Sequence, residues 1–395
     1  MNVLDLFCGA GGFSLGFQMA GFNTVAAVDI DEWATDTFKA NHPTSKVMKA
    51  DISTFSDEKI ISEFGNLDID VIVGGPPCQG FSVANKNAGD PKDPRNSLFR
   101  HYLRVGKLLN PSLMIMENVP GLVRAKTKNG DKVLDIICAE LSELGYNVYH
   151  DILEAVDYGV PQIRKRLVII ASKAPLESPF PRKTHSVKLN DSLIDEGIKL
   201  TPSLWDAISD LPEINAREGA EQMEYDKKAE NDYQRNLRKG SKMVNNHLAM
   251  KHSKRMVERF ESMNWGDSSK DLPEHLRPLL RNGNGEISTK VYDQNNRRMP
   301  PHKPCHTIAA SFYANFVHPF KHRNFTAREG ARIQSFPDNY VFKGKPTVVS
   351  RMLLAREGRH DENYLCQYNQ IGNAVPPIMS KAIADNLLIQ LKMTK

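Results

Sequence analysis

The chain has 395 residues, of which 40% are hydrophobic and 25% charged, as in soluble globular proteins of one large or two smaller domains. No apolar run is long enough to cross a bilayer, and the first residues do not resemble a secretory signal. The five cysteines are scattered and odd in number, which argues against a disulfide framework and a zinc site. We therefore expect a cytoplasmic, metal-free protein. Its net charge of +5 permits nucleic-acid binding without requiring it.

Short apolar runs alternate with amphipathic stretches through the first 175 residues. The apolar runs predict strands at Val3–Phe7, Thr24–Val28, Lys46–Ala50, Asp70–Val73, Leu113–Met116 and Leu167–Ala171. The amphipathic stretches predict helices at Phe13–Ala20, Glu32–Asn41, Leu98–Leu109 and Lys132–Leu144. This alternation predicts an α/β fold with a mostly parallel sheet, covered on both faces, whose ligands bind beyond the carboxyl ends of the strands.

The composition changes after about residue 175. The segment to about Asn296 is more polar, and its stretch Gln234–Arg259 is strongly basic. From about Arg298 the chain again has a globular composition, and it ends in an apolar-periodic helix, Pro377–Leu391. The basic stretch could bind nucleic acid, or it could be a solvated helix face.

The first predicted strand runs into a glycine-rich turn, Asp5-Leu-Phe-Cys-Gly-Ala-Gly-Gly-Phe13. Glycines let a backbone approach a ligand closely, and the following helix offers free N–H groups. Asp29, at the end of the second strand, is suitably placed to bind ribose hydroxyls. The third glycine of a dinucleotide fingerprint is replaced by Ser14. The turn could therefore bind an adenosine cofactor or NAD, or be a plain tight turn.

A cysteine follows the fourth strand directly, in Gly74-Gly-Pro-Pro-Cys-Gln-Gly-Phe-Ser82. Two prolines stiffen the chain before Cys78, which lies in a loop rather than in an apolar run. Such a position suits a reactive thiolate, whereas many loop cysteines are inert.

Polar residues also mark two later strands. Glu117 ends the fifth strand, where a partly buried carboxyl could act as an acid or could simply be solvated. Gln162, Arg164 and Arg166 share one face of an extended segment, which indicates either a polar pocket or a solvated edge.

Taken together, these motifs resemble the DNA cytosine-5 methyltransferase family, and the bacterial modification enzymes of restriction–modification systems in particular. The matching segments occur in the family's order: DLFCGAGGFSLGF, GGPPCQGFS, ENV, QIRKR, RMPPHKPCHTIA, TAREGARIQSFPD and QIGNAVPP. PPCQGFS after a strand is highly specific, whereas ENV alone is trivial. The segments run from Asp5 to about Pro377, nearly the whole chain.

The resemblance implies a Rossmann-like S-adenosylmethionine-dependent domain with a smaller DNA-recognition lobe. It assigns Asp29 to the ribose, Ile30 to a face of adenine, and Asp51 and Ile52 to the adenine edge. The residues that it implies at the cofactor are Phe7, Gly9, Gly11, Gly12, Phe13, Asp29, Ile30, Asp51, Ile52, Pro76, Leu98, Asn373 and Ala374.

For the reaction, the resemblance implies that Cys78 is the nucleophile, that Glu117 acts at ring nitrogen N3 of cytosine, and that Arg166 donates to the carbonyl, supported by Arg164. Thr307 would help to order the recognition lobe. The residues that it implies at the DNA or the target base are Pro77, Gln79, Ser82, Gln162 and Thr307. Residues 80–97 would form a mobile lid over a flipped-out nucleotide.

The resemblance also implies domain boundaries and partners. Residues 1–175 and 371–395 would form the catalytic domain, residues 176–322 the recognition lobe, and residues 323–370 a hinge. We expect a monomer that acts on double-stranded DNA and does not bind a membrane. Its methylation would protect the host DNA from a cognate restriction endonuclease.

Two departures from the family pattern stand out. Ile30 replaces an aromatic residue that many members carry after the ribose acid, so adenine would meet an aliphatic side chain. An extra stretch, about residues 347–364, could be a solvated insertion or a DNA contact.

Three other functions compete with DNA methylation. An RNA cytosine methyltransferase would use the same chemistry, but the long segment between QIRKR and RMPPHKP favours DNA. A binding protein with a dead site would lack Cys78, Glu117 or the glycine turn, and all are present. An NAD enzyme is disfavoured by the incomplete glycine pattern and by the PPCQ loop.

Overall fold

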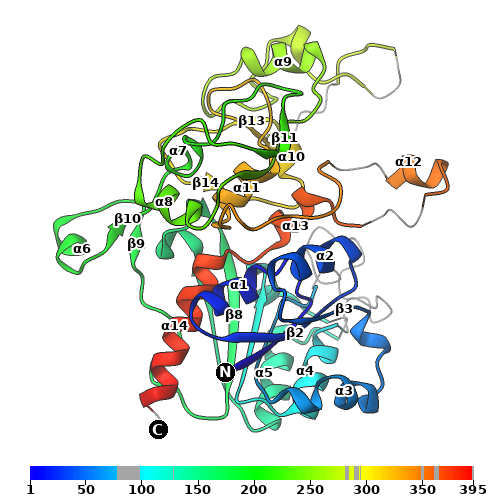
Figure 1. Cartoon of the computed structure of the whole chain (residues 1–395), viewed down its shortest axis with the longest axis vertical. Helices are drawn as coiled ribbons and strands as arrows, with labels where there is room; N and C mark the ends of the chain where they lie inside the picture. Colours follow the sequence, from blue (N-terminus) through cyan, green and yellow to red (C-terminus); the bar gives the residue numbers. More distant parts are fainter. Residues whose placement is uncertain are drawn as a thin grey trace. The chain divides into compact units, whose positions relative to one another are not determined.

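The computed structural model describes two compact units (Figure 1). Unit 1 comprises Met1–Gly159, Arg164–Lys199 and Ala374–Lys395, and unit 2 comprises Val160–Ile163 and Leu200–Asn373. Within these ranges the structure describes residues 1–77, 98–127, 129–280, 284–288, 293, 295–347, 351–359 and 364–393. The predicted domain boundaries stay a prediction.

Unit 1 is built on a central sheet. Its strands are β1 (Asn2–Leu6), β2 (Asn23–Asp29), β3 (Lys46–Lys49), β4 (Ile69–Gly74), β5 (Leu113–Asn118), β6 (Asn147–Glu154) and β8 (Lys165–Ser172). Among the described residues these form one seven-stranded sheet in the order β3-β2-β1-β4-β5-β8-β6. The first five are parallel, whereas β8 runs antiparallel to both β5 and β6. The predicted α/β class with a mostly parallel sheet is confirmed.

Helices cover both faces of this sheet (Figure 1). They are α1 (Gly12–Met19), α2 (Glu32–Asn41), α3 (Asp57–Phe64), α4 (Leu98–Leu109), α5 (Val133–Glu143) and α14 (Pro377–Met393). Side chains of α3, α4 and α5 share the main hydrophobic core with alternate strand residues such as Leu4 and Leu6. Unit 1 also contains the short 3-10 helices η1 (Ile52–Thr54), η2 (Gly65–Leu67), η5 (Pro120–Arg124) and η6 (Ala155–Tyr158) and the short helix α6 (Asp191–Asp195). Strand β9 (His185–Ser186) pairs with β10 (Lys199–Leu200), whose last residue is the first of the next segment of unit 2.

The first and last helices of the chain pack closely because residue 16 is glycine. A Cβ built at Gly16 would lie 2.4 Å from the Ser380 Cβ and 2.5 Å from the Pro377 carbonyl oxygen. The Ser380 hydroxyl also donates to the Phe13 carbonyl at 2.7 Å. The C-terminal helix is therefore part of the layer that α1 forms on the sheet.

An acidic side chain is buried between β1 and α1. Asp5 points to the face opposite Leu4 and Leu6, where its carboxylate accepts a 2.6 Å hydrogen bond from the Ser14 hydroxyl. Burial and, to a smaller extent, the nearby Asp29 charge raise the pKa of Asp5 to about 7, although the hydrogen bonds from Ser14 oppose the rise. The pair joins the strand to the helix on either side of the glycine-rich turn.

Unit 2 has little regular structure and is held together by buried charges. Its main elements are β7 (Gln162–Ile163), α7 (Leu204–Ile208), β11 (Gly219–Met223), α8 (Asp232–Arg238), β12 (Val244–Leu248), α9 (Lys254–Glu261), η7 (Glu274–Leu276), β13 (Arg297–Arg298), β14 (Cys305–His306), α10 (Phe312–Asn315), β15 (Phe316–Val317), α11 (Ala327–Ile333), α12 (Arg351–Arg356) and α13 (Gln367–Asn373). Arg332 on α11 forms ion pairs with Asp338 at 2.6 Å and with Asp210 at 2.8 Å. Arg323 binds Glu329 through both terminal nitrogens. Buried charges are tolerated because each has a bonded partner.

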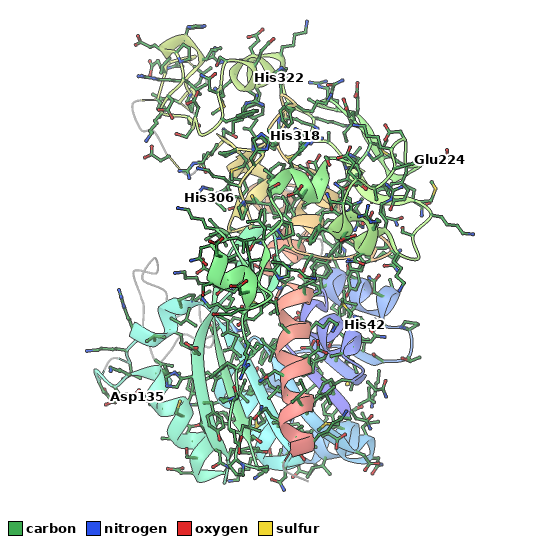
Figure 2. The ribbon with its side chains drawn as sticks, turned by 90° about the vertical axis from the view of Figure 1, so that its left-hand side faces the viewer. His42, Asp135, Glu224, His306, His318 and His322 are labelled. Atoms are coloured by element: carbon green, nitrogen blue, oxygen red, sulfur yellow. The ribbon has the colours of Figure 1, made fainter. Side chains whose placement is uncertain are left out.

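His318 lies beside this network in unit 2 (Figure 2). Its Nε2 atom is 3.6 Å from the Glu329 carboxylate, which favours the charged imidazolium. Burial outweighs that attraction and lowers the pKa of His318 to about 3, so the ring is neutral near pH 7.

Replacing Gly16 by Ala should force α1 and α14 apart. We expect a loss of about 1–3 kcal/mol in the free energy of unfolding, as in other overpacked cores. Urea denaturation followed by circular dichroism measures this loss. Gly65→Ala is the matched control, because its Cβ would meet only Ile61, at 3.5 Å. Equal stability of the two variants would contradict the close approach.

Asp5 should make the stability fall as pH rises. Its carboxyl keeps a proton in the folded state up to a pKa of about 7 but loses it near pH 4 when unfolded, so folding is favoured less at higher pH. Asp5→Asn should therefore gain stability over the wild type between pH 5 and pH 8, on the order of a few kcal/mol. Urea titrations at the two pH values test this, with the exposed Asp36→Asn as control. A wild-type pH dependence in Asp5→Asn would contradict it.

Candidate active site

The turn after β1 departs from ordinary backbone geometry. Phe7, Gly9 and Gly11 all have positive φ angles, of 58°, 51° and 81°. For Phe7 this is a strained conformation of the kind found at functional sites. A Cβ added at Gly9 would meet no atom within 4 Å, so there is open space beside the turn. Gly12 and Phe13 begin α1, and Phe13 is buried against Phe17.

Asp29 ends β2 and faces this turn. Its carboxylate accepts hydrogen bonds from the backbone N–H groups of Gly9, at 2.8 Å, and Asp31, at 2.9 Å. Burial raises the pKa of Asp29, and the two backbone donors oppose that effect. The next side chain, Ile30, is 64% exposed. A fixed carboxylate beside an exposed aliphatic side chain suits a ligand with both a polar and a flat apolar part.

Asp51 and Ile52 lie at the same edge of the sheet, after β3. The Asp51 carboxylate caps η1 by accepting from the Ser53 N–H at 2.9 Å. Arg104 of α4 donates to the carbonyls of Ile52, at 3.3 Å, and Phe55, at 2.8 Å. The helix that begins with half-buried Leu98 therefore holds the turn that carries Asp51.

An ion pair connects β5 and β8. The Glu117 carboxylate lies 2.6 Å from Nε of Arg166, and both side chains are 12% exposed. Glu117 is opposite Val168 in the antiparallel register, so Arg166 is its diagonal neighbour on the same face. A Cβ at Gly75 would come within 3.3 Å of the Glu117 carboxylate. The loop after β4 therefore runs close to this pair.

Asn118 fixes the start of that loop. Its side-chain amide donates to the Pro76 carbonyl at 3.0 Å and accepts from the Val119 N–H at 2.8 Å. Pro76 is buried and Pro77 is exposed. Cys78, Gln79, Ser82 and the predicted lid, residues 80–97, lie outside the described residues, so their predicted roles stay predictions.

Arg164 is buried just before β8. Its guanidinium donates to the Ala374 carbonyl at 3.0 Å, and this contact joins two distant segments of unit 1. Burial and the adjacent Arg166 charge lower the pKa of Arg164. Ala374 itself is buried, whereas Asn373 is an exposed residue at the end of α13 in unit 2.

The two predicted DNA contacts in unit 2 differ in accessibility. Gln162 is completely buried, with its amide bonded to the Gln334 side chain at 2.8 Å and to the Ile308 N–H at 2.7 Å. This arrangement favours a framework role, although contact with DNA stays a prediction. Thr307 is exposed, and its hydroxyl donates to the Ile163 carbonyl at 2.7 Å.

The basic stretch of unit 2 is not one solvated helix face, because it spans α8, β12 and α9. Arg238 turns inward to Asp210, at 3.0 Å, and the buried Arg259 donates to the Leu276 carbonyl at 2.7 Å. The exposed cations that remain are Lys239, Lys242, Lys251 and Lys254, together with Arg235, which is paired with Asp232. In the insertion, α12 spans Arg351–Arg356.

Sequence reasoning missed four residues that shape the site. The signal for Asp5 was an acid within an apolar strand, and for Asn118 it was an amide beside the predicted acid Glu117. Gly75 belongs to the motif GGPPCQGFS, but its close approach to Glu117 could not be read from that motif, and no sequence signal marks Arg104, because both roles depend on contacts with distant residues. Among the described residues, no group of three or more His, Cys, Asp or Glu could hold a metal ion, and no helix is long and apolar enough to cross a membrane.

Comparison with known proteins identifies the family. The family model of C-5 cytosine-specific DNA methylases matches residues 1–388. The chain is 46% identical to the type II methyltransferase M.DdeI of Desulfomicrobium norvegicum, over 98% of this chain and 88% of the relative. It is 35% identical to M1.HphI of Haemophilus parahaemolyticus, over 98% and 87%.

A solved structure has the same fold. It is a prophage-encoded Escherichia coli protein assigned as a DNA modification methyltransferase, with a TM-score of 0.72 and 27% identity over 99% of both chains. The resemblance found in the sequence motifs is thereby confirmed. The chain belongs to the C-5 cytosine-specific DNA methylase family and is a DNA cytosine-5 methyltransferase of the type II restriction–modification kind.

Proposed function

We propose that this enzyme methylates one cytosine of a short DNA sequence through a covalent bond between Cys78 and carbon 6 of a flipped-out base. The observation that carries the proposal is the Glu117–Arg166 ion pair beside Gly75, three residues before Cys78. An acid and a cation at the start of the loop that leads to a cysteine are the groups needed to activate a pyrimidine ring.

The described residues of the β1–β3 edge fit S-adenosylmethionine. The Asp29 carboxylate would bind the ribose hydroxyls, the exposed Ile30 side chain would cover adenine, and Asp51 would meet its edge. The open space beside Gly9 would receive the part of the cofactor nearest the turn. When bound, S-adenosylmethionine supplies an electrophilic methyl group on a sulfonium centre.

Carbon 5 of cytosine is too weak a nucleophile to take this methyl group unaided. The Cys78 thiolate adds to carbon 6 and breaks the aromatic conjugation, which raises the electron density at carbon 5. Glu117 holds a proton at N3, and Arg166 donates to the carbonyl, so the charge that develops on the ring is stabilised. When the methyl group moves to carbon 5, S-adenosylhomocysteine would be the product left behind. A base then removes the carbon 5 proton, the Cys78 thiolate leaves as the double bond between carbons 5 and 6 re-forms, and the N3 proton returns to Glu117.

The reacting atoms are hidden in a stacked duplex, so the target base must leave the helix. Unit 2 would read the neighbouring bases in the major groove, and its exposed lysines would meet phosphates. We further propose that the enzyme acts as a monomer, and that its product resists a restriction endonuclease that cuts the same site. The similarity to type II methyltransferases supports the second of these proposals.

Cys78→Ala should lower methylation by on the order of 10³-fold or more, because no thiolate can then add to carbon 6. Affinity for S-adenosylmethionine should not change. The measurement is bisulfite sequencing of a host genome that otherwise lacks cytosine-5 methylation. We expect protection of one short motif in the wild type and none in the variant.

Cys138→Ala is the matched control, since Cys138 is a half-buried cysteine on α5 that packs against the main core. Near-wild-type methylation by Cys78→Ala would overturn the nucleophile assignment. If the soluble wild type binds S-adenosylmethionine but protects no DNA motif, RNA becomes the substrate to test.

Asp29→Ala should weaken S-adenosylmethionine binding roughly 10- to 100-fold, because the ribose loses a charged hydrogen-bond acceptor. Isothermal titration calorimetry measures the affinity, and thermal unfolding verifies that the variant is folded. Asp36→Ala removes an exposed carboxylate from the adjacent helix α2 and should bind normally. An unchanged affinity for Asp29→Ala would remove Asp29 from the cofactor site.

A further inference from the structure

The connection from β5 to α5 begins directly after Glu117 and Asn118. It runs from Val119 to Lys132, longer than the roughly two to six residues usual between a strand and a helix. Because it follows the carboxyl end of a parallel strand, it lies at the edge of the sheet where Glu117 is placed. Long ordered connections at this edge commonly carry function.

Two described segments of this connection, residues 125–127 and 129–132, pair with each other as a braced hairpin that ends at Val133, the first residue of α5. The Val133 N–H donates to the Ala125 carbonyl at 3.0 Å, and the Thr127 N–H donates to the Asp131 carbonyl at 2.9 Å. Ala125 and Val133 are buried in the main core of unit 1. The base of the hairpin is therefore fixed, and its position relative to Glu117 is set by the sheet.

Two lysines lie directly opposite each other on this hairpin. Lys126 and Lys132 form an antiparallel bridge, so their side chains share one face. Both are exposed, and neither forms an ion pair with a carboxylate among the described residues. Arg124, also exposed, precedes them at the end of η5.

Like charges directly opposite on paired strands are destabilising. In unit 2 the buried arginines are each neutralised by an acid or satisfied by carbonyls, as Arg332 is by Asp210 and Asp338. Among the described carboxylates the lysine pair has no such partner, although Asp135 lies only three residues after Lys132 in the sequence, in the first turn of α5 (Figure 2). An anion that bridges the two ammonium groups would relieve the repulsion.

We propose that Lys126 and Lys132, which face each other on this hairpin, bind backbone phosphates of the DNA duplex whose cytosine is methylated. This inference rests on the proposed function, because it places the partner at the edge that carries Glu117. Repeated phosphates fit a pair of rigidly held cations, and such contacts fix the duplex without reading its sequence. The hairpin thus supplies a docking surface within unit 1, in addition to the lysines of unit 2.

The test is a salt series of DNA affinity for Lys126→Ala/Lys132→Ala. Each phosphate contact contributes about 0.9 to the slope of log affinity against log salt, so the slope should fall by up to about 1.8. Between roughly 50 and 200 mM salt, the variant should lose about tenfold less affinity than the wild type. Calorimetry should show unchanged S-adenosylmethionine binding.

The matched control is Lys39→Ala/Lys107→Ala. It removes two exposed lysines from the last turns of α2 and α4, at the opposite edge of the sheet. This control and the charge-preserving Lys126→Arg/Lys132→Arg should both keep the wild-type slope. The Lys126→Ala/Lys132→Ala variant should unfold at the same temperature as the wild type or a higher one, because the repulsion between the two lysines is removed.

Equal slopes and affinities for the two alanine pairs would overturn the proposal and leave the proposed function standing. If Lys126→Ala/Lys132→Ala unfolds at a lower temperature but keeps the wild-type salt slope, the two lysines have a structural role, and the proposal is overturned as well. If the wild type itself neither binds nor methylates DNA, the proposed function fails, and the hairpin proposal fails with it.

Discussion

The ion pair between Glu117 and Arg166 depends on the one reversal in the sheet. In a purely parallel sheet, only the last residues of each strand reach the carboxyl edge. Strand β8 runs antiparallel to β5, so its first residues lie beside the last residues of β5. Arg166, near the start of β8, is thereby brought within 2.6 Å of Glu117, near the end of β5. A cation and an acid that are distant in sequence can then act on the same ligand.

Bringing these charges together constrains the backbone around them. Glycine at position 75 lets the loop from β4 pass the Glu117 carboxylate, since a Cβ would lie only 3.3 Å from it. The neighbouring Asn118 amide holds the Pro76 carbonyl, so the same strand positions both the acid and the loop that leads to Cys78. Arg164 joins the start of β8 to Ala374. The chemistry thus rests on backbone contacts as much as on the charged side chains.

Much of this arrangement could be predicted from the sequence, because strand ends carry the unusual residues. The six predicted strands overlap observed ones, and helices α2 and α4 have the predicted bounds. Strand β6, Asn147–Glu154, was missed because it mixes polar and apolar residues and leaves most of them exposed or half-buried. The inward turn of Arg238 and Arg259 was missed because each depends on an acceptor far along the chain, Asp210 and the Leu276 carbonyl. Local pattern predicts elements, whereas such pairings require the fold.

The cations of this chain differ in whether a carboxylate neutralises them, and this difference says more about their roles than their number does. Arg332 and Arg323 are buried against carboxylates and hold unit 2 together, so they are unavailable to a ligand. Lys126 and Lys132 face each other across a braced hairpin, and no carboxylate in the described part of the chain pairs with either of them. A folding requirement explains the first kind, because buried charges must be paired. It does not explain the second, since opposed like charges cost stability. Unpaired opposed cations therefore mark a surface for an anionic partner better than a net charge of +5 does.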